Sequence, residues 1–160
     1  MTGKYRKMNL FEVNLGTRTI RESKNFIPGK KPVTFSVQEC SAGASLCYDL
    51  RFPEIYQAYR RKGCQLLVIP SAFTQKTGRS HWEILARARA IENLCYVVGP
   101  NQVGTDERGI TAYGNSLIIS PWGEILARGS DTREEILYAD ISLAEVKRVR
   151  KVLPGVFKNR

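Results

Sequence analysis

The sequence predicts an α/β fold, in which helices pack on the faces of a mixed sheet. Residues 66–70 and 96–98 form short apolar runs without a charge, which is typical of strands that are covered on both faces. Helical signals alternate with these runs, because a proline at position 53 suits a first helical turn and apolar residues recur at helical spacing over residues 84–95. This alternation predicts the α/β (or α+β) class. The sequence shows no repeat and no clear domain boundary.

The first half of the chain predicts strands that lead to Cys47 and to a later polar loop. The predicted elements up to residue 70 are strands at 33–37, 42–46 and 66–70 and a helix from Pro53 to Gly63. Proline fits the first turn of a helix, and glycine adopts the left-handed conformation that commonly follows a helix. If the strands before Cys47 and before loop 71–79 are parallel, both segments lie at the same sheet edge. That edge is where open α/β sheets bind ligands.

A second helix is predicted to begin at Ser80, because Ser80 and Glu83 have the spacing of a capping box. The buried face predicted for this helix consists of Ile84, Ala88, Ile91 and Cys95. The elements predicted after it are strands at 96–98, 117–119, 125–127 and 136–139, a hairpin turn at 121–124 and a C-terminal helix capped by Ser142. Residues 99–114 show no periodic pattern, and we expect them to be irregular.

The basic charge of the chain is confined to its two ends. The formal net charge is +10, yet residues 1–31 and 146–160 each contribute +6, which leaves −2 for the segment between them. Terminal basic segments can bind nucleic-acid phosphates, and they are also common as solvated tails. Because no aromatic-interleaved patch or nucleic-acid motif accompanies them, we do not expect nucleic acid as a partner.

The cysteines and the N-terminal segment predict a cytoplasmic protein with reduced thiols. The four cysteines contain no C-x-x-C pair, and the single histidine, His81, does not complete a zinc cluster. We therefore expect no metal and no cofactor. The N-terminal segment lacks the apolar core of a secretory signal, and no apolar stretch is long enough to cross a membrane.

Cys47 is the candidate nucleophile, because it stands between a predicted strand and the start of a helix. A thiol in that position is presented on a sharp turn, and the helix dipole favours its thiolate form. A buried, inert cysteine is an equally open alternative. His81 could act as its base in a Cys–His dyad, although a structural or surface histidine fits that position better. Lys7 has apolar and aromatic neighbours and is the better partner, since its charge could stabilise the oxyanion of an acyl intermediate.

Several segments of the chain, taken together and in this order, resemble the Nit branch of the carbon–nitrogen hydrolase (nitrilase) superfamily. The matching segments are residues 5–11, 22–23, 28–29, 47–54, 70–73, 77–78, 81–83, 88–92, 95–98 and 121–123. Within the branch, the sequence is more similar to deaminated-glutathione amidases than to omega-amidases. The resemblance implies an α-β-β-α sandwich that hydrolyses the C–N bond of a small, carboxylate-bearing amide through a cysteine thioester. It also implies a homo-oligomer, because members of the superfamily commonly self-associate.

The resemblance also implies roles for individual residues. Cys47 is similar to the nucleophile, Lys7 to the oxyanion-stabilising lysine and Glu22 to a second acidic residue that positions the reactive groups. The residues implied to bind substrate are Tyr48 (through its backbone N–H at the oxyanion), Arg51 (at the substrate carboxylate), Phe73 and Thr77. An arginine fork suits a planar carboxylate. A structural salt bridge from Arg51 to Asp49 or Glu54 is an equally open alternative.

One part of the family pattern has no counterpart in this sequence. The general base of the family is a glutamate upstream of the lysine, and no residue before Lys7 matches it. We therefore expect residues 1–160 to be the C-terminal portion of a single carbon–nitrogen hydrolase domain, with an incomplete sandwich and little activity of its own. The alternative is a non-catalytic remnant that acts through oligomer or partner interfaces.

Overall fold

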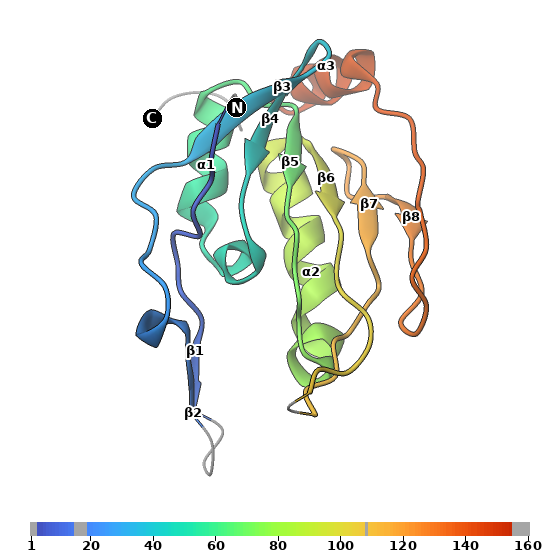
Figure 1. Ribbon diagram of the computed structural model, residues 1–160. Coiled ribbons are helices and arrows are strands. Elements are labelled where there is room, and N and C mark those ends of the chain that lie inside the picture. The colour runs from blue at the N-terminus through green and yellow to red at the C-terminus, as the bar shows by residue number, and fades with distance from the viewer. Residues whose placement is uncertain (1–2, 15–18, 108, 155–160) are drawn as a thin grey trace.

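The fold is built on one six-stranded mixed sheet. The computed structural model describes residues 3–14, 19–107 and 109–154 (Figure 1). The strands lie side by side in chain order: β3 (Val33–Val37), β4 (Cys40–Ala44), β5 (Leu66–Val68), β6 (Tyr96–Gly99), β7 (Leu117–Ile119) and β8 (Ile125–Arg128). The three strands β4, β5 and β6 are parallel, and the remaining neighbours pair antiparallel. The predicted α/β class is confirmed.

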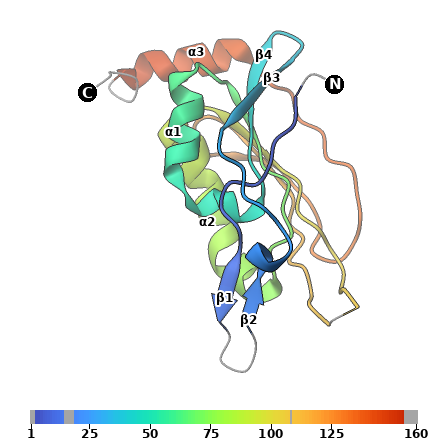
Figure 2. The ribbon, with the colours of Figure 1, turned by 60° about the vertical axis from the view of Figure 1, so that its left-hand side comes forward.

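Two helices connect the parallel strands and cover one face of the sheet. These are α1 (Pro53–Arg61) and α2 (Gln75–Asn93), and both lie on the same side in Figures 1 and 2. Because side chains alternate along a strand, Leu67 and Val97 point to the helices, whereas Leu66 and Tyr96 point to the other face. There they pack with Val146 of the third helix, α3 (Leu143–Val152).

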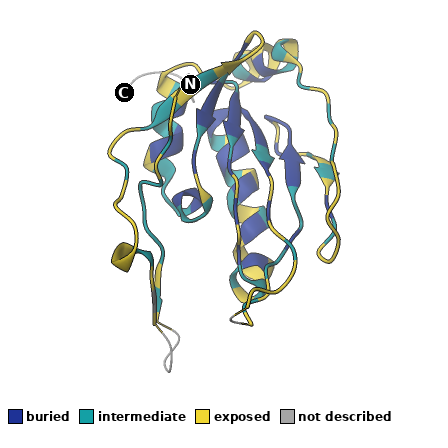
Figure 3. Cartoon of the chain, viewed as in Figure 1, coloured by how far each residue is buried: buried dark blue, intermediate teal, exposed yellow. Residues whose placement is uncertain are grey.

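The N-terminal segment forms an arm that is separate from the main sheet. It holds a two-stranded ladder of β1 (Glu12–Asn14) and β2 (Thr19–Arg21), followed by the short 3-10 helix η1 (Glu22–Lys24). Figure 3 shows that the arm is exposed or half-buried, whereas buried residues concentrate in the strands and the inner faces of the helices. No helix of the described residues is long and apolar enough to cross a membrane.

Most of the elements predicted from the sequence are confirmed. Strand β3 has the predicted bounds, and α1 begins at Pro53 and is followed by Gly63 at a φ of +79°. The turn between β7 and β8 is the predicted hairpin. The Ser142 hydroxyl caps α3 by accepting a hydrogen bond from the backbone N–H of Glu145 at 3.2 Å.

Helix α2 differs from its prediction in both its start and its buried face. It begins at Gln75, and the backbone N–H of Gly78 donates to the Thr74 carbonyl at 2.7 Å, so the Ser80 capping box is wrong. The helix has a glycine at position 78 because the Tyr113 side chain packs so closely there that no room is left for a β-carbon. The buried residues of this helix include Trp82, Ala86, Ala90 and Asn93, together with Arg89. Ile84 and Ile91 are instead 69% and 44% exposed.

Two strand predictions also need correction. The strand before Cys47 is β4 at Cys40–Ala44 rather than 42–46, because β3 pairs with it from Cys40 and the pairing with β5 ends at Ala44. Residues 136–139 form no strand. No neighbouring strand pairs with them, and the side chains of Ile136 and Tyr138 are 77% and 80% exposed.

Candidate active site

Cys47 lies on a tight turn at the carboxyl end of β4. It opens the 3-10 helix η2 (Cys47–Arg51) with a φ of +48°, in the left-handed region that residues other than glycine rarely adopt. Its backbone N–H donates to the carbonyl of Pro70 at 2.9 Å, which joins this turn to the end of β5. The thiol is therefore presented on a sharp turn, as the sequence predicts.

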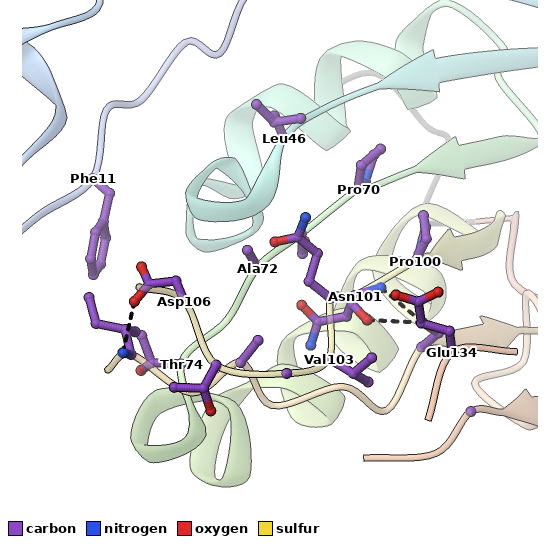
Figure 4. Close-up of a pocket in the computed structure, with 18 of the residues that line it drawn as sticks. Phe11, Leu46, Pro70, Ala72, Thr74, Pro100, Asn101, Val103, Asp106 and Glu134 are labelled. Atoms are coloured by element: carbon purple, nitrogen blue, oxygen red, sulfur yellow. Dashed lines mark hydrogen bonds between the residues drawn. The ribbon is translucent and has the colours of Figure 1, made fainter. Parts of the chain in front are cut away.

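A cavity of about 990 Å³ lies beyond the carboxyl ends of the three parallel strands. Figure 4 shows Leu46, Pro70 and Pro100, which follow β4, β5 and β6, along one side of this cavity. Phe11 of the N-terminal arm lies across from them. Glu22 and Ala72 also line the cavity. Parallel α/β sheets place ligands at this edge.

Lys7 and Glu22 form an ion pair inside the arm. Lys7 Nζ donates to Glu22 Oε2 at 2.5 Å, and the Lys7 side chain is only 10% exposed. The same carboxylate oxygen accepts the backbone N–H of Phe11 at 2.7 Å, and the backbone N–H of Glu22 donates to the Phe11 carbonyl at 3.0 Å. These bonds fix the lysine relative to the arm.

The Cys47 thiol combines a buried position with several polar neighbours. Burial raises its pKa above the ordinary value of 9.0, and the Glu22 charge adds to that increase. The backbone N–H groups of Ala72 and Tyr48 and the charge of Lys7 act in the opposite direction. Since the net direction is upward, the thiol is protonated at neutral pH, and its attack on a substrate requires a base that removes the proton.

Arg51 forms no ion pair with another described residue. Its guanidinium carbon lies 5.7 Å from the centre of the Tyr48 ring and 5.7 Å from that of the Phe73 ring. Its Nη2 lies 3.1 Å from Nδ1 of His81. No carboxylate within the described ranges is within ion-pair distance of Arg51, so the structure does not show the alternative salt bridge to Asp49 or Glu54.

The predicted pocket residues Phe73 and Thr77 lie at and just inside the start of α2. Phe73 is buried, and its ring packs against Trp82 with the ring centres 5.1 Å apart. Thr77 lies in the first turn of α2, where its hydroxyl is 3.0 Å from that of Thr74. His81 follows Thr77 by one turn and hydrogen-bonds to Arg51, and no bond between His81 and Cys47 is seen.

The sequence reasoning did not assign Asp49 a place in the site, although this residue ties the site together. It is fully buried and accepts hydrogen bonds from Tyr5, Met8, Asn9 and Leu46. The shortest come from the Tyr5 hydroxyl at 2.7 Å and the backbone N–H of Asn9 at 2.8 Å. Burial and the bond to Asp49 raise the pKa of Tyr5. Because its partners flank Lys7 on both sides, Asp49 anchors the lysine segment to the Cys47 turn.

Residues 1–151 match the profile of carbon–nitrogen hydrolases. The chain belongs to the carbon–nitrogen hydrolase family. It is 42% identical to the omega-amidase NIT2 of Homo sapiens, over 100% of this chain and 58% of the human protein. The omega-amidase NIT2 of Danio rerio is 40% identical, over 94% of this chain and 54% of the fish protein. The chain thus spans less than two thirds of the length of these curated relatives.

Solved structures of carbon–nitrogen hydrolases share the fold. The C. elegans NitFhit protein has a TM-score of 0.92 and 38% identity, over 99% of this chain and 39% of that protein. Saccharomyces cerevisiae Nit3, a member of branch 10 of the nitrilase superfamily, has a TM-score of 0.85 and 34% identity, over 96% and 53%. A mutant amidase from Nesterenkonia sp. AN1 has a TM-score of 0.68 and 29% identity, over 80% and 46%. In that enzyme the acetamide moiety of fluoroacetamide is bound to the active-site cysteine. These matches confirm the resemblance to the Nit branch and the nitrilase-like α/β fold.

Proposed function

We propose that this chain carries the nucleophile, the oxyanion site and the carboxylate pocket of an amidase that cleaves a small, carboxylate-bearing amide. The observation that carries this proposal is the convergence of Cys47, Lys7 and Glu22 at the carboxyl edge of the sheet, where Glu22 also lines the cavity. Family membership supports it, because relatives of this chain are named amidases.

In the proposed reaction, Cys47 Sγ attacks the carbonyl carbon of the amide and its proton passes through a base to the leaving nitrogen. The C–N bond breaks, ammonia leaves, and a thioester remains on the sulfur. Lys7 Nζ and the backbone N–H of Tyr48 stabilise the oxyanion of the tetrahedral intermediate. Glu22 orients Lys7 through the 2.5 Å ion pair. Water then hydrolyses the thioester.

The surroundings of Arg51 support a substrate that bears a carboxylate. A guanidinium that lies over two aromatic rings and has no acidic partner among the described residues is suited to bidentate binding of a planar anion. We assign Phe73 to the apolar side of the carboxylate site and the Thr77 hydroxyl to one further hydrogen bond. Deaminated-glutathione amidases and omega-amidases both remain candidates for the finer class, and the curated relatives named above are omega-amidases.

We propose further that residues 1–160 form the C-terminal portion of a single carbon–nitrogen hydrolase domain. Support comes from the match over residues 1–151 and from the 58% of the human relative that the chain spans. The family resemblance implies a glutamate as general base, and we assign none of the described residues to that role. We therefore expect slow amide turnover by this chain alone. The four free cysteines fit the reducing conditions of the cytoplasm, which is the location we propose.

The test uses an activated substrate that needs little help from a base. The chain is incubated with the mono-p-nitrophenyl ester of succinic acid and, separately, with p-nitrophenyl butyrate, which lacks the carboxylate. Intact-mass and peptide analysis should find a succinyl group on Cys47, formed faster than the butyryl group, and Arg51→Leu should remove this preference. A succinyl adduct that forms equally fast on the Cys47→Ala variant would exclude the proposed nucleophile.

We also propose that the chain forms a homo-oligomer through the outer face of α2. Ile84 and Ile91 lie on this face and are 69% and 44% exposed, and Trp122 of the β7–β8 turn is 47% exposed. Ile91 contacts the same turn at Gly123. A second copy could cover these side chains in an isologous contact. In sedimentation velocity, Ile84→Glu should reduce the oligomer to monomers, whereas Ile136→Glu, at an equally exposed isoleucine elsewhere, should not. An oligomer that survives Ile84→Glu contradicts this interface.

A further inference from the structure

The single histidine of the chain makes a hydrogen bond to Arg51 in which the partner determines which atom accepts. His81 Nδ1 lies 3.1 Å from Nη2 of Arg51. A guanidinium is always charged in proteins and only donates hydrogen bonds. The ring nitrogen that faces it must therefore be the acceptor, which places the proton of a neutral ring on Nε2. The structure thus assigns the tautomer through the chemistry of the partner.

Among the described residues, this hydrogen bond gives the guanidinium of Arg51 a directional constraint that the neighbouring aromatic rings do not give. The Tyr48 and Phe73 rings, each 5.7 Å from the guanidinium carbon, hold the position of the group. They offer no directional acceptor. The bond to His81 engages an N–H group on Nη2 of Arg51. It therefore fixes the directions in which the remaining N–H groups of the guanidinium point. A bidentate carboxylate site requires such a fixed orientation.

The position of His81 on α2 fits this arrangement. Thr77 precedes His81 by four residues, so both lie on the same face of the helix. Trp82, the next residue, packs against Phe73. The distance between α2 and η2 is held independently, because Nε of the buried Arg89 donates to the carbonyl of Leu50 at 2.9 Å. Removing the exposed His81 ring should therefore leave the packing of the two elements intact.

We propose that His81 is a positioning residue that orients Arg51 for the carboxylate of the substrate and so contributes to substrate choice. The inference rests on the proposed role of Arg51 at the substrate carboxylate. A neutral acceptor is suited to this task, because it orients the guanidinium without neutralising it. An acidic side chain at the same place would form an ion pair with Arg51 and compete with the substrate.

The test compares variants of His81 that keep, remove or replace the acceptor. Binding of succinamic acid and of butyramide, its carboxylate-free counterpart, is measured by calorimetry or NMR titration, which does not require turnover. His81→Leu should weaken succinamic acid binding by roughly fivefold to tenfold, as expected for the net contribution of one typical hydrogen bond. His81→Gln, which keeps an acceptor, should stay within about twofold of the wild type. His81→Glu should weaken binding more than His81→Leu, and butyramide binding should not change.

Controls distinguish a failure of the proposed role of His81 from a failure of the proposed role of Arg51, on which it rests. Thermal unfolding checks that each variant is folded, and Ser80→Leu, at the adjacent exposed position, should bind like the wild type. If Arg51→Leu does not weaken binding of succinamic acid, the carboxylate role of Arg51 fails and this inference fails with it. If Arg51→Leu weakens binding and His81→Leu does not, or if His81→Gln is as poor as His81→Leu, only the role of His81 is overturned.

Discussion

At the scale of single residues, the site depends on a thiol that is protonated at rest. Burial raises the pKa of Cys47, while Lys7 and two backbone N–H groups favour the thiolate without reversing the shift. The lysine therefore acts on two states of the reaction, since it favours the thiolate before attack and the oxyanion after it. Its own position depends on Glu22 and, through the neighbouring backbone, on Asp49.

Thiol labelling tests the electrostatic part of this description. The rate of Cys47 alkylation by iodoacetamide should rise with pH up to a pKa above that of a free thiol. Lys7→Met should slow the labelling near neutral pH, because it removes a positive charge and leaves Glu22 unpaired. The exposed Lys4 gives a matched control, since Lys4→Met should have no effect. Faster labelling of the Lys7→Met variant would contradict the assigned geometry.

Asp49 allows a second test at this scale. Asp49→Asn replaces a carboxylate, which only accepts hydrogen bonds, with an amide in a buried site. The NH2 group of the amide cannot accept the hydrogen bonds that several donors make to Asp49. We expect the free energy of unfolding to fall by about 2–4 kcal/mol, as for a broken buried network. Urea denaturation measures the change, with Asp140→Asn at an exposed position as the control. A loss no greater than that of the control would show that Asp49 does not anchor the arm.

At the scale of elements, the sequence predicts local signals well and long-range packing poorly. Pro53 and Gly63 mark α1 correctly, because helix ends are set by neighbouring residues. The predicted start of α2 is wrong, because the Ser80–Glu83 spacing matches a capping box although the helix already begins at Gln75. The predicted buried face is also wrong, because Trp82, Ala86, Arg89 and Asn93 recur at the same spacing as Ile84, Ala88, Ile91 and Cys95, so spacing alone does not choose between the two faces.

The same limits apply to the site. The strand–helix position predicts Cys47, apolar and aromatic neighbours favour Lys7, and the family resemblance adds Glu22. The fold brings the three side chains together. Asp49 was missed because its donors from the arm lie about 40 residues away in the sequence. A hydrogen-bond network between such distant segments leaves no local sequence pattern from which it could be predicted.

Gly78 gives a prediction at the element scale, because replacing it with alanine should destabilise the protein although alanine has the higher helix propensity. Alanine is favoured over glycine within a helix by about 1 kcal/mol. A β-carbon at Gly78 would, however, lie 2.3–2.6 Å from Cγ, Cβ and Cδ1 of Tyr113. Gly78→Ala should therefore lower the midpoint of thermal unfolding, and combining it with Tyr113→Ala should reduce the loss in a double-mutant cycle. A Gly78→Ala variant that is more stable than the wild type would contradict the observed packing.

At the scale of the whole molecule, the candidate catalytic residues lie at one edge of the sheet. The buried core contains neutral thiols and phenols. Burial raises the pKa of Cys95 and of Tyr59 to about 12, and it also raises the pKa of Tyr56 and Cys64. Folding therefore favours the protonated forms of these groups. Their contribution to stability is complete below the ordinary pKa values of 9.0 for a thiol and 10.0 for a phenol, and it is lost as the pH rises toward about 12.

This linkage predicts the direction of alkaline instability. Above pH 9 the unfolded chain loses protons that the folded chain retains, so the free energy of unfolding should fall as the pH rises. Urea denaturation at pH 8 and at pH 10.5 measures the decrease. Cys95→Ala removes one of the groups and should make the pH dependence shallower. A free energy of unfolding that stays constant or rises over this range would show that these groups are not shielded in the folded state.

The central claim is that the sheet edge transfers an acyl group from an amide to Cys47, and trapping that acyl group tests it most directly. The chain is incubated with succinamic acid and hydroxylamine, which captures a thioester as a hydroxamic acid without water activation. Because we assign the general base to none of the described residues, we predict slow hydroxamate formation, measured over a long incubation, by the wild type and by Cys40→Ala, a variant of another free thiol, and none by Cys47→Ala. Absence of hydroxamate from the wild type, or its persistence in Cys47→Ala, would contradict the claim.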